Sequence, residues 1–79
     1  MAYSRNILVD DGSATVYEVE TIIMDALMLD RRDLPEVSLI NGPRDTQVFV
    51  DMTGQGLYEE QEMFDALYDV FGNSVHIDE

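Results

Sequence analysis

The chain lacks cysteine and lysine and has a single histidine. Without cysteine it has neither a disulfide nor a thiolate zinc site to hold a fold together. A secreted domain of this length usually needs such a cross-link, so the sequence predicts a cytoplasmic protein. No apolar run of ~18 residues occurs and no signal-peptide pattern opens the chain, so neither a membrane span nor export is expected.

Basic residues are scarce. Four arginines face seventeen aspartates and glutamates, which gives a formal net charge of -13. A small domain needs a net charge of only ~2–8 for solubility, and a larger excess opposes the compact state by self-repulsion. Phosphates would be repelled, so direct binding to nucleic acid or to an anionic membrane is disfavoured. A basic protein surface would be attracted, and we expect such a partner to bind with a strong salt dependence.

Motifs for catalysis and metal binding are missing as well. No P-loop, no dinucleotide fingerprint and no nucleophile elbow occurs. The acidic turn at 10–12 (DDG) does not have the spacing of a calcium loop, and turn chemistry explains it. His76 is expected to be a partly exposed strand residue near Asp51 and Asp78, where it could give pH sensitivity. We therefore predict a non-enzymatic protein with no metal and no cofactor.

The hydrophobic content is that of an ordinary globular protein, 46% of 79 residues, and predicts one domain over residues 1–79. The clearest element is an amphipathic helix over 57–71, followed by Gly72 as a C-terminal stop. At ~100° per residue its apolar side is expected to bury five residues. These are Leu57, Phe64, Leu67, Tyr68 and Phe71.

A second helix is predicted over 16–29. Thr15 and Glu18 have the spacing of a capping box, in which each side chain satisfies a backbone amide of the other residue. Its predicted buried stripe is Val16, Val19, Ile23, Ala26 and Leu27. The apolar sector is unusually broad, with Tyr17, Met24 and Met28 on one flank and Ile22 and Leu29 on the other.

Four strands are predicted, over 3–9, 36–40, 46–52 and 74–78, with a hairpin loop at 41–45. The order of elements is that of a split βαβ, ferredoxin-like α+β fold: a four-stranded antiparallel sheet covered by two helices on one face. Right-handed crossovers would place strands one and three in the middle. The competing prediction is that the last strand is absent or pairs with another chain.

The outer sides of both helices are expected to form one surface of carboxylates uninterrupted by basic residues. Like charges three or four residues apart oppose helix formation by a few tenths of a kcal/mol per pair, so such rows have a cost. They could imitate the phosphates of a duplex and occupy a basic channel. The alternative is an ordinary solvated helix face. The predicted partner-binding residues are Glu18, Asp25, Glu59, Glu62, Asp65 and Asp69.

The other face of the sheet is the second candidate surface. By alternation, Leu8, Ile40 and Phe49 point away from the helices and could form an exposed apolar patch. RNA-binding domains of similar topology have aromatic residues on a basic background there, whereas here one aromatic residue lies on an acidic background, so RNA binding is excluded. Self-association as a homodimer is the more credible use. A register error of one residue would swap the two faces.

In size, acidity and lack of catalytic motifs, the chain resembles the small inhibitors that phages direct against host nucleic-acid machinery, including anti-CRISPR proteins. The likeness is one of class, so no functional residue is transferred. It implies an inhibitor that mimics nucleic-acid charge and blocks the basic groove of a defence or nucleic-acid-processing complex, in the cytoplasm of an infected bacterium. The alternative is an antitoxin, immunity-type or dimeric adaptor module that binds a protein through the flank of Tyr17, Met24 and Met28 or through the sheet patch.

Overall fold

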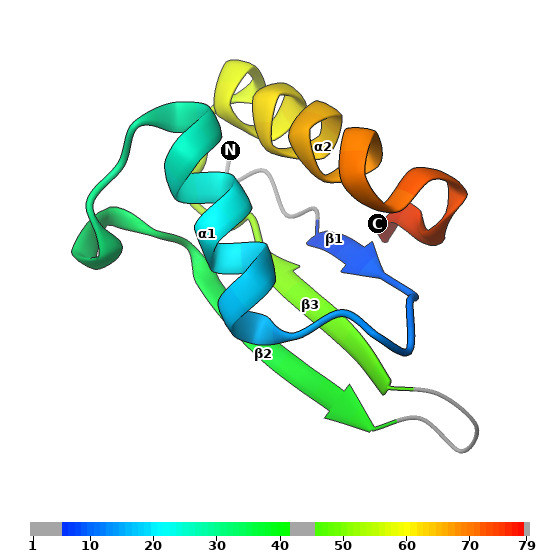
Figure 1. The fold of residues 1–79 in the computed structure, drawn as a ribbon. Coiled ribbons are helices and arrows are strands. Elements are labelled where there is room, and N and C mark those ends of the chain that lie inside the picture. Colours follow the sequence, from blue (N-terminus) through cyan, green and yellow to red (C-terminus); the bar gives the residue numbers. More distant parts are fainter. Residues whose placement is uncertain (1–5, 42–45, 79) are drawn as a thin grey trace.

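The computed structural model describes residues 6–41 and 46–78 of the chain (Figure 1). Within these ranges, the side chains of Asn41, Thr46 and Asp78 are left undescribed. Most of the predicted hairpin loop at 41–45 and the first residues of the predicted strand at 3–9 lie outside the described residues.

The described residues form four strands, two α-helices and two single-turn 3₁₀ helices. In chain order the elements are β1 (Asn6–Val9), α1 (Val16–Leu27), η1 (Arg31–Asp33), β2 (Glu36–Asn41), β3 (Thr46–Asp51), α2 (Leu57–Phe71), η2 (Gly72–Ser74) and β4 (Val75–Asp78). The predicted last strand is therefore present and starts at Val75, because Ser74 belongs to η2.

The strands form one sheet in the order β2-β3-β1-β4, and every neighbouring pair is antiparallel. β1 and β3 lie in the middle, as predicted, and β4 pairs with β1 within the chain. The two helices cover one face of the sheet (Figure 1). The architecture is α+β, with the core between the helix layer and the sheet.

The core is built by strict alternation in the middle strands. Ile7 and Val9 of β1 are opposite Val50 and Val48 of β3, and all four are fully buried. Met52, just past β3, is buried as predicted for the same side of that strand. The helices contribute Val19, Ile23, Met63 and Leu67. The strand residues therefore face the sides that alternation predicted, and Leu8 and Phe49 lie across from each other on the open face.

Helix α1 starts as predicted and ends earlier. The Oγ1 of Thr15 accepts a hydrogen bond from the amide of Glu18 at 3.1 Å. The helix ends at Leu27 rather than at 29, because Met28 adopts the left-handed conformation with φ 54° and its amide donates to the carbonyl of Met24. Ala26 was predicted to be buried and is exposed.

Helix α2 has the predicted bounds but is rotated about its axis relative to the prediction. Its fully buried residues are Met63 and Leu67, joined by Glu60 at 6% exposure. Leu57 and Tyr68 were predicted to be inside and are 65% and 47% exposed. Residues 60, 63 and 67 have the spacing of a buried helical stripe, as the predicted set does. Because one of the three is a glutamate, apolar periodicity did not predict this orientation of the helix. The predicted stop is correct, since Gly72 has φ 62°.

Candidate partner-binding surface

The two helices carry eight acidic residues and no basic one, and they lie side by side over the sheet (Figure 1). Six of the eight are the predicted partner-binding residues, and the other two are Glu20 and Glu60. We call the outer side of α1 and α2, with these six carboxylates, the helix face. Glu18, Asp25, Asp65 and Asp69 are exposed, whereas Glu59 and Glu62 are half-buried.

The exposed carboxylates of the helix face have few partners. Asp65 accepts a hydrogen bond from Nε2 of Gln61 at 2.9 Å, an i, i+4 contact within α2. No arginine in the described part of the chain pairs with Glu18, Asp25, Asp65 or Asp69. Their charge is therefore presented to solvent.

Glu59 has a local role instead. It is the third residue of α2, and its carboxylate folds back against Gly56, the N-cap, so closely that a Cβ at Gly56 would clash with it. A carboxylate at this position is stabilised by the positive end of the helix dipole. Glu59 thus supports the start of α2 and contributes less to the helix face than predicted.

Asp25 and Asp69 lie where an acid is unfavourable. Each is in the last turn of its helix, and neither last turn contains a basic residue. A negative charge near the C-terminal end of a helix opposes the dipole by ~0.3–1 kcal/mol at an exposed site. Neither residue caps or packs the helix it belongs to, so folding does not explain these two carboxylates.

The two arginines that the structure describes, Arg31 and Arg32, lie just past the end of α1. Arg31 pairs with Glu20 at 3.1 Å and lies 5.9 Å from the centre of the Tyr17 ring. Arg32 pairs with Asp30 at 3.7 Å. Glu20, the half-buried acid of α1, therefore has a basic partner within the described residues, unlike the carboxylates of the helix face.

Glu60 is the residue that the sequence analysis missed. Its side chain is only 6% exposed, and it is engaged in a polar interaction. It occupies the first turn of α2, where the helix dipole favours a carboxylate. The available signal was the spacing Glu60, Met63, Leu67, which places a carboxylate in line with two core residues. Glu60 belongs to the core and adds nothing to the helix face.

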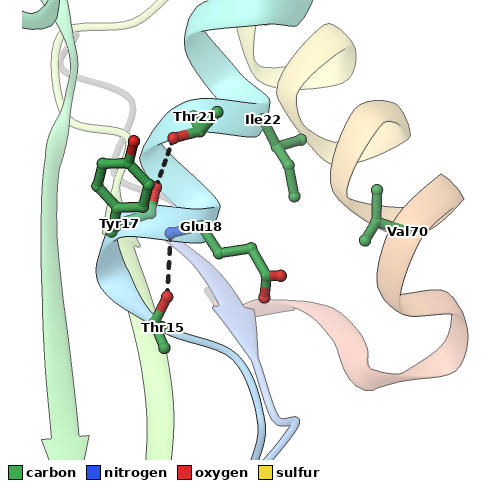
Figure 2. A pocket seen from close by; sticks show the side chains of 6 residues that line it. All are labelled: Thr15, Tyr17, Glu18, Thr21, Ile22 and Val70. Atoms are coloured by element: carbon green, nitrogen blue, oxygen red, sulfur yellow. Dashed lines mark hydrogen bonds between the residues drawn. The ribbon is translucent and has the colours of Figure 1, made fainter.

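An open hollow of about 420 Å³ lies on the outer side of the seam between the helices. Figure 2 shows Ile22 of α1 and Val70 of α2 facing each other across it, with the carboxylate of Glu18 extending toward α2. The Glu18 side chain therefore does not reach back to the amide of Thr15, as a full capping box requires. The residues lining the hollow are Thr15, Tyr17, Glu18, Thr21, Ile22 and Val70.

The open face of the sheet, called the sheet face below, has a different character. Leu8 and Phe49 are half-buried at its centre, Ile40 is 40% exposed on the edge strand β2, and His76 is exposed beside Leu8. Asp51 stands two residues after Phe49, and hydrogen bonds from the side chain and amide of Thr53 lower its pKa. The predicted apolar patch is therefore small and bordered by acid.

The acidic turn at 10–12 behaves as turn chemistry predicts. Oδ1 of Asp11 accepts hydrogen bonds from the hydroxyl and the amide of Ser13, at 2.7 and 2.9 Å, and these bonds lower the pKa of Asp11. Within the described residues, no group of three or more His, Cys, Asp or Glu side chains is placed to hold a metal ion. Within the same ranges, neither helix has the length and apolarity needed to cross a bilayer.

The comparisons with known proteins return nothing: no family model matches the chain, and no curated protein and no solved structure matches it. The geometry of the helix face is therefore the main guide to what the protein does.

Proposed function

We propose that this protein is a non-enzymatic inhibitor that mimics nucleic-acid charge, similar in class to anti-CRISPR proteins. It would bind the basic DNA- or RNA-binding groove of a host defence or nucleic-acid-processing complex and exclude the true ligand. The finer description of the fold belongs to the same proposal: two βα units joined by a hairpin, with the strand order β2-β3-β1-β4, fit a ferredoxin-like domain.

One observation above all supports the proposal: eight acids and no base on the two helices, with Asp25 and Asp69 in last turns where the helix dipole opposes them. Repulsion along the rows adds a few tenths of a kcal/mol for each like-charged pair three or four residues apart. A small domain has little stability to spare, so a surface that opposes folding calls for a functional reason. Attraction to a basic groove supplies one, because complementary charge accelerates encounter and fixes orientation.

The experiment uses the protein to capture binders from a bacterial lysate and then measures competition with a DNA or RNA oligonucleotide for each captured protein. Glu62, Asp65 and Asp69 are next replaced together by lysine. This variant should lose at least about 100-fold in affinity, because several attractive contacts become repulsive. Circular dichroism should show an intact fold, because Asp65 and Asp69 are exposed and Glu62 is not part of the buried core.

The matched control replaces Asp10, Asp33 and Glu36 by lysine. These residues are exposed and lie outside both helices. Each substitution changes the charge by two, so both triple variants carry -7 in place of -13. The control should retain affinity within about fivefold, since only its long-range attraction is reduced. Equal losses in the two variants would show that net charge alone is recognised, and a captured protein that is indifferent to nucleic acid would refute the mimicry.

A protein-binding adaptor is the second candidate, and one observation favours it. Tyr17 in the first turn of α1 and Met28 at its C-cap are 69% and 90% exposed, which is a large exposure for such apolar side chains. An adaptor of this kind would lose its partner on Met24→Asp, which places a charge in the middle of the flank of Tyr17, Met24 and Met28. The charge mimic would retain its partner.

A further inference from the structure

We infer that the hollow between α1 and α2 receives a single arginine or lysine side chain of the partner. This inference rests on the proposed function, and it names the point of the helix face at which one cationic side chain is recognised. The hollow has the two features that such a side chain requires: apolar walls for its methylene stem, and for its charged head a carboxylate that has no partner among the described residues (Figure 2).

The walls come from facing positions on the two helices. Ile22 is half-buried, and Val70 is 56% exposed although it is an aliphatic residue next to a packed helix seam. Both side chains line the hollow, although Ile22 is also packed against the hydrophobic core. A methylene stem laid between them would remove apolar surface from water, which favours binding.

The polar groups of the hollow leave one site for a cation. The hydroxyl of Thr21 donates to the carbonyl of Tyr17 at 2.8 Å, and Oγ1 of Thr15 accepts from the amide of Glu18. Both hydroxyls are therefore engaged within α1. The carboxylate of Glu18 has no partner in the described residues, and it extends from α1 toward α2 below Val70 (Figure 2).

Charge decides between the classes of occupant. The helices around the hollow carry no base, so an anionic ligand would be repelled from it, whereas a cation would be attracted by Glu18 and by the rest of the helix face. A purely apolar side chain would bury Glu18 without compensation, which is unfavourable. A long cationic side chain would pack its methylene stem against the apolar walls and pair its charged head with the carboxylate of Glu18.

The test uses a hexa-arginine peptide as the probe and a matched hexapeptide of 2-amino-3-guanidinopropionate, which keeps the guanidinium groups but lacks two methylenes of each stem. Binding is followed at low salt by the methyl resonances of the ¹³C-labelled protein. The arginine peptide should shift the Ile22 and Val70 methyls, and the short-stemmed peptide should shift them less. Glu18→Gln and Val70→Ser should each weaken hexa-arginine binding by about threefold, which corresponds to an exposed ion pair or a partial stem contact.

Asp25→Asn is the control, because it removes one charge from the same helix outside the lining of the hollow. It should weaken binding by less than about 1.5-fold. Two results would show that the peptide binds to the acidic surface as a whole and not to the hollow. In one, the peptide binds but the methyl resonances of Ile22 and Val70 do not shift; in the other, Glu18→Gln and Asp25→Asn weaken binding equally. If hexa-arginine does not bind in a salt-dependent manner at all, the proposed function fails together with this inference.

Discussion

The helix face and the sheet face are the two broad surfaces of this domain, and they differ in how folding accounts for them. On the sheet face, Leu8 and Phe49 are half-buried and lie opposite each other in the sheet. Oδ1 of Asp51 accepts a hydrogen bond from the amide of Thr53, so most features of this face have a structural explanation. On the helix face, Asp25 and Asp69 oppose the dipoles of their own helices and cap nothing. A surface that folding does not explain is the better candidate for the surface that the protein uses.

The two faces also predict opposite behaviour toward a partner. An interface on the helix face depends on charge, so it weakens as salt screens the carboxylates. An interface on the sheet face would depend on a small apolar patch and would change little with salt. A homodimer through the sheet face would in addition bring together two copies of net charge -13, which repel each other.

The largest expected effect tests which side of α2 packs against the core. Leu67→Ala should destabilise the domain by about 2–5 kcal/mol, because Leu67 is fully buried and the substitution leaves a cavity. Leu57→Ala is the matched control on the same helix and should change stability by less than about 0.5 kcal/mol, because Leu57 is 65% exposed. Urea unfolding measures both. Comparable losses would show that the rotation of α2 is wrong, and with it the assignment of the outer carboxylates.

A smaller effect separates the two faces directly. Phe49→Asp should cost about 1–2 kcal/mol, because a half-buried ring is lost and a charge is placed on the same strand face as Asp51. Affinity for the captured partner should stay within about twofold, since the helix face is unchanged. Phe49→Tyr keeps the ring and serves as the control. A loss of binding by Phe49→Asp alone, with the fold intact, would move the interface to the sheet face.

The smallest effect concerns the end of α1. Met28→Gly should stabilise the domain by about 0.5–1 kcal/mol, because Met28 has φ 54° and glycine adopts that conformation without strain. Met24→Gly, the same substitution inside the helix, should destabilise by about 1 kcal/mol or more. Thermal unfolding distinguishes the two signs. Partner affinity should not change with Met28→Gly, and a large loss would favour the adaptor that uses the flank of Tyr17 and Met28.

Sequence predicted the strands well because their signal is simple. Alternation in ILV and in VFVDM specifies which side chains face the core, and Ile7, Val9, Val48 and Val50 are buried as it predicts. The bounds of α2 followed from its apolar periodicity and from Gly72. The end of α1 was harder to predict, because a methionine occupies the left-handed position in which glycine or asparagine would normally mark the stop.

The rotation of α2 could not be derived from periodicity alone. A buried Glu60 and an exposed Leu57 violate the rule that apolar residues face inward, and only tertiary packing decides between two phases of similar quality. The predicted carboxylates of the helix face remain a prediction, although four of the six are exposed. The hollow had no signal in the sequence, because it depends on how α1 and α2 meet and brings together residues such as Ile22 and Val70 that are distant in the chain.

The most direct test of charge recognition by the helix face is the dissociation constant of the captured partner as a function of salt. Between about 50 and about 200 mM KCl we expect affinity to fall more than about tenfold for the natural sequence. The variant with Glu62, Asp65 and Asp69 replaced by lysine should lose that dependence, whereas the control with Asp10, Asp33 and Glu36 replaced should keep most of it. An affinity that stays constant across this range would contradict recognition of the partner by charge.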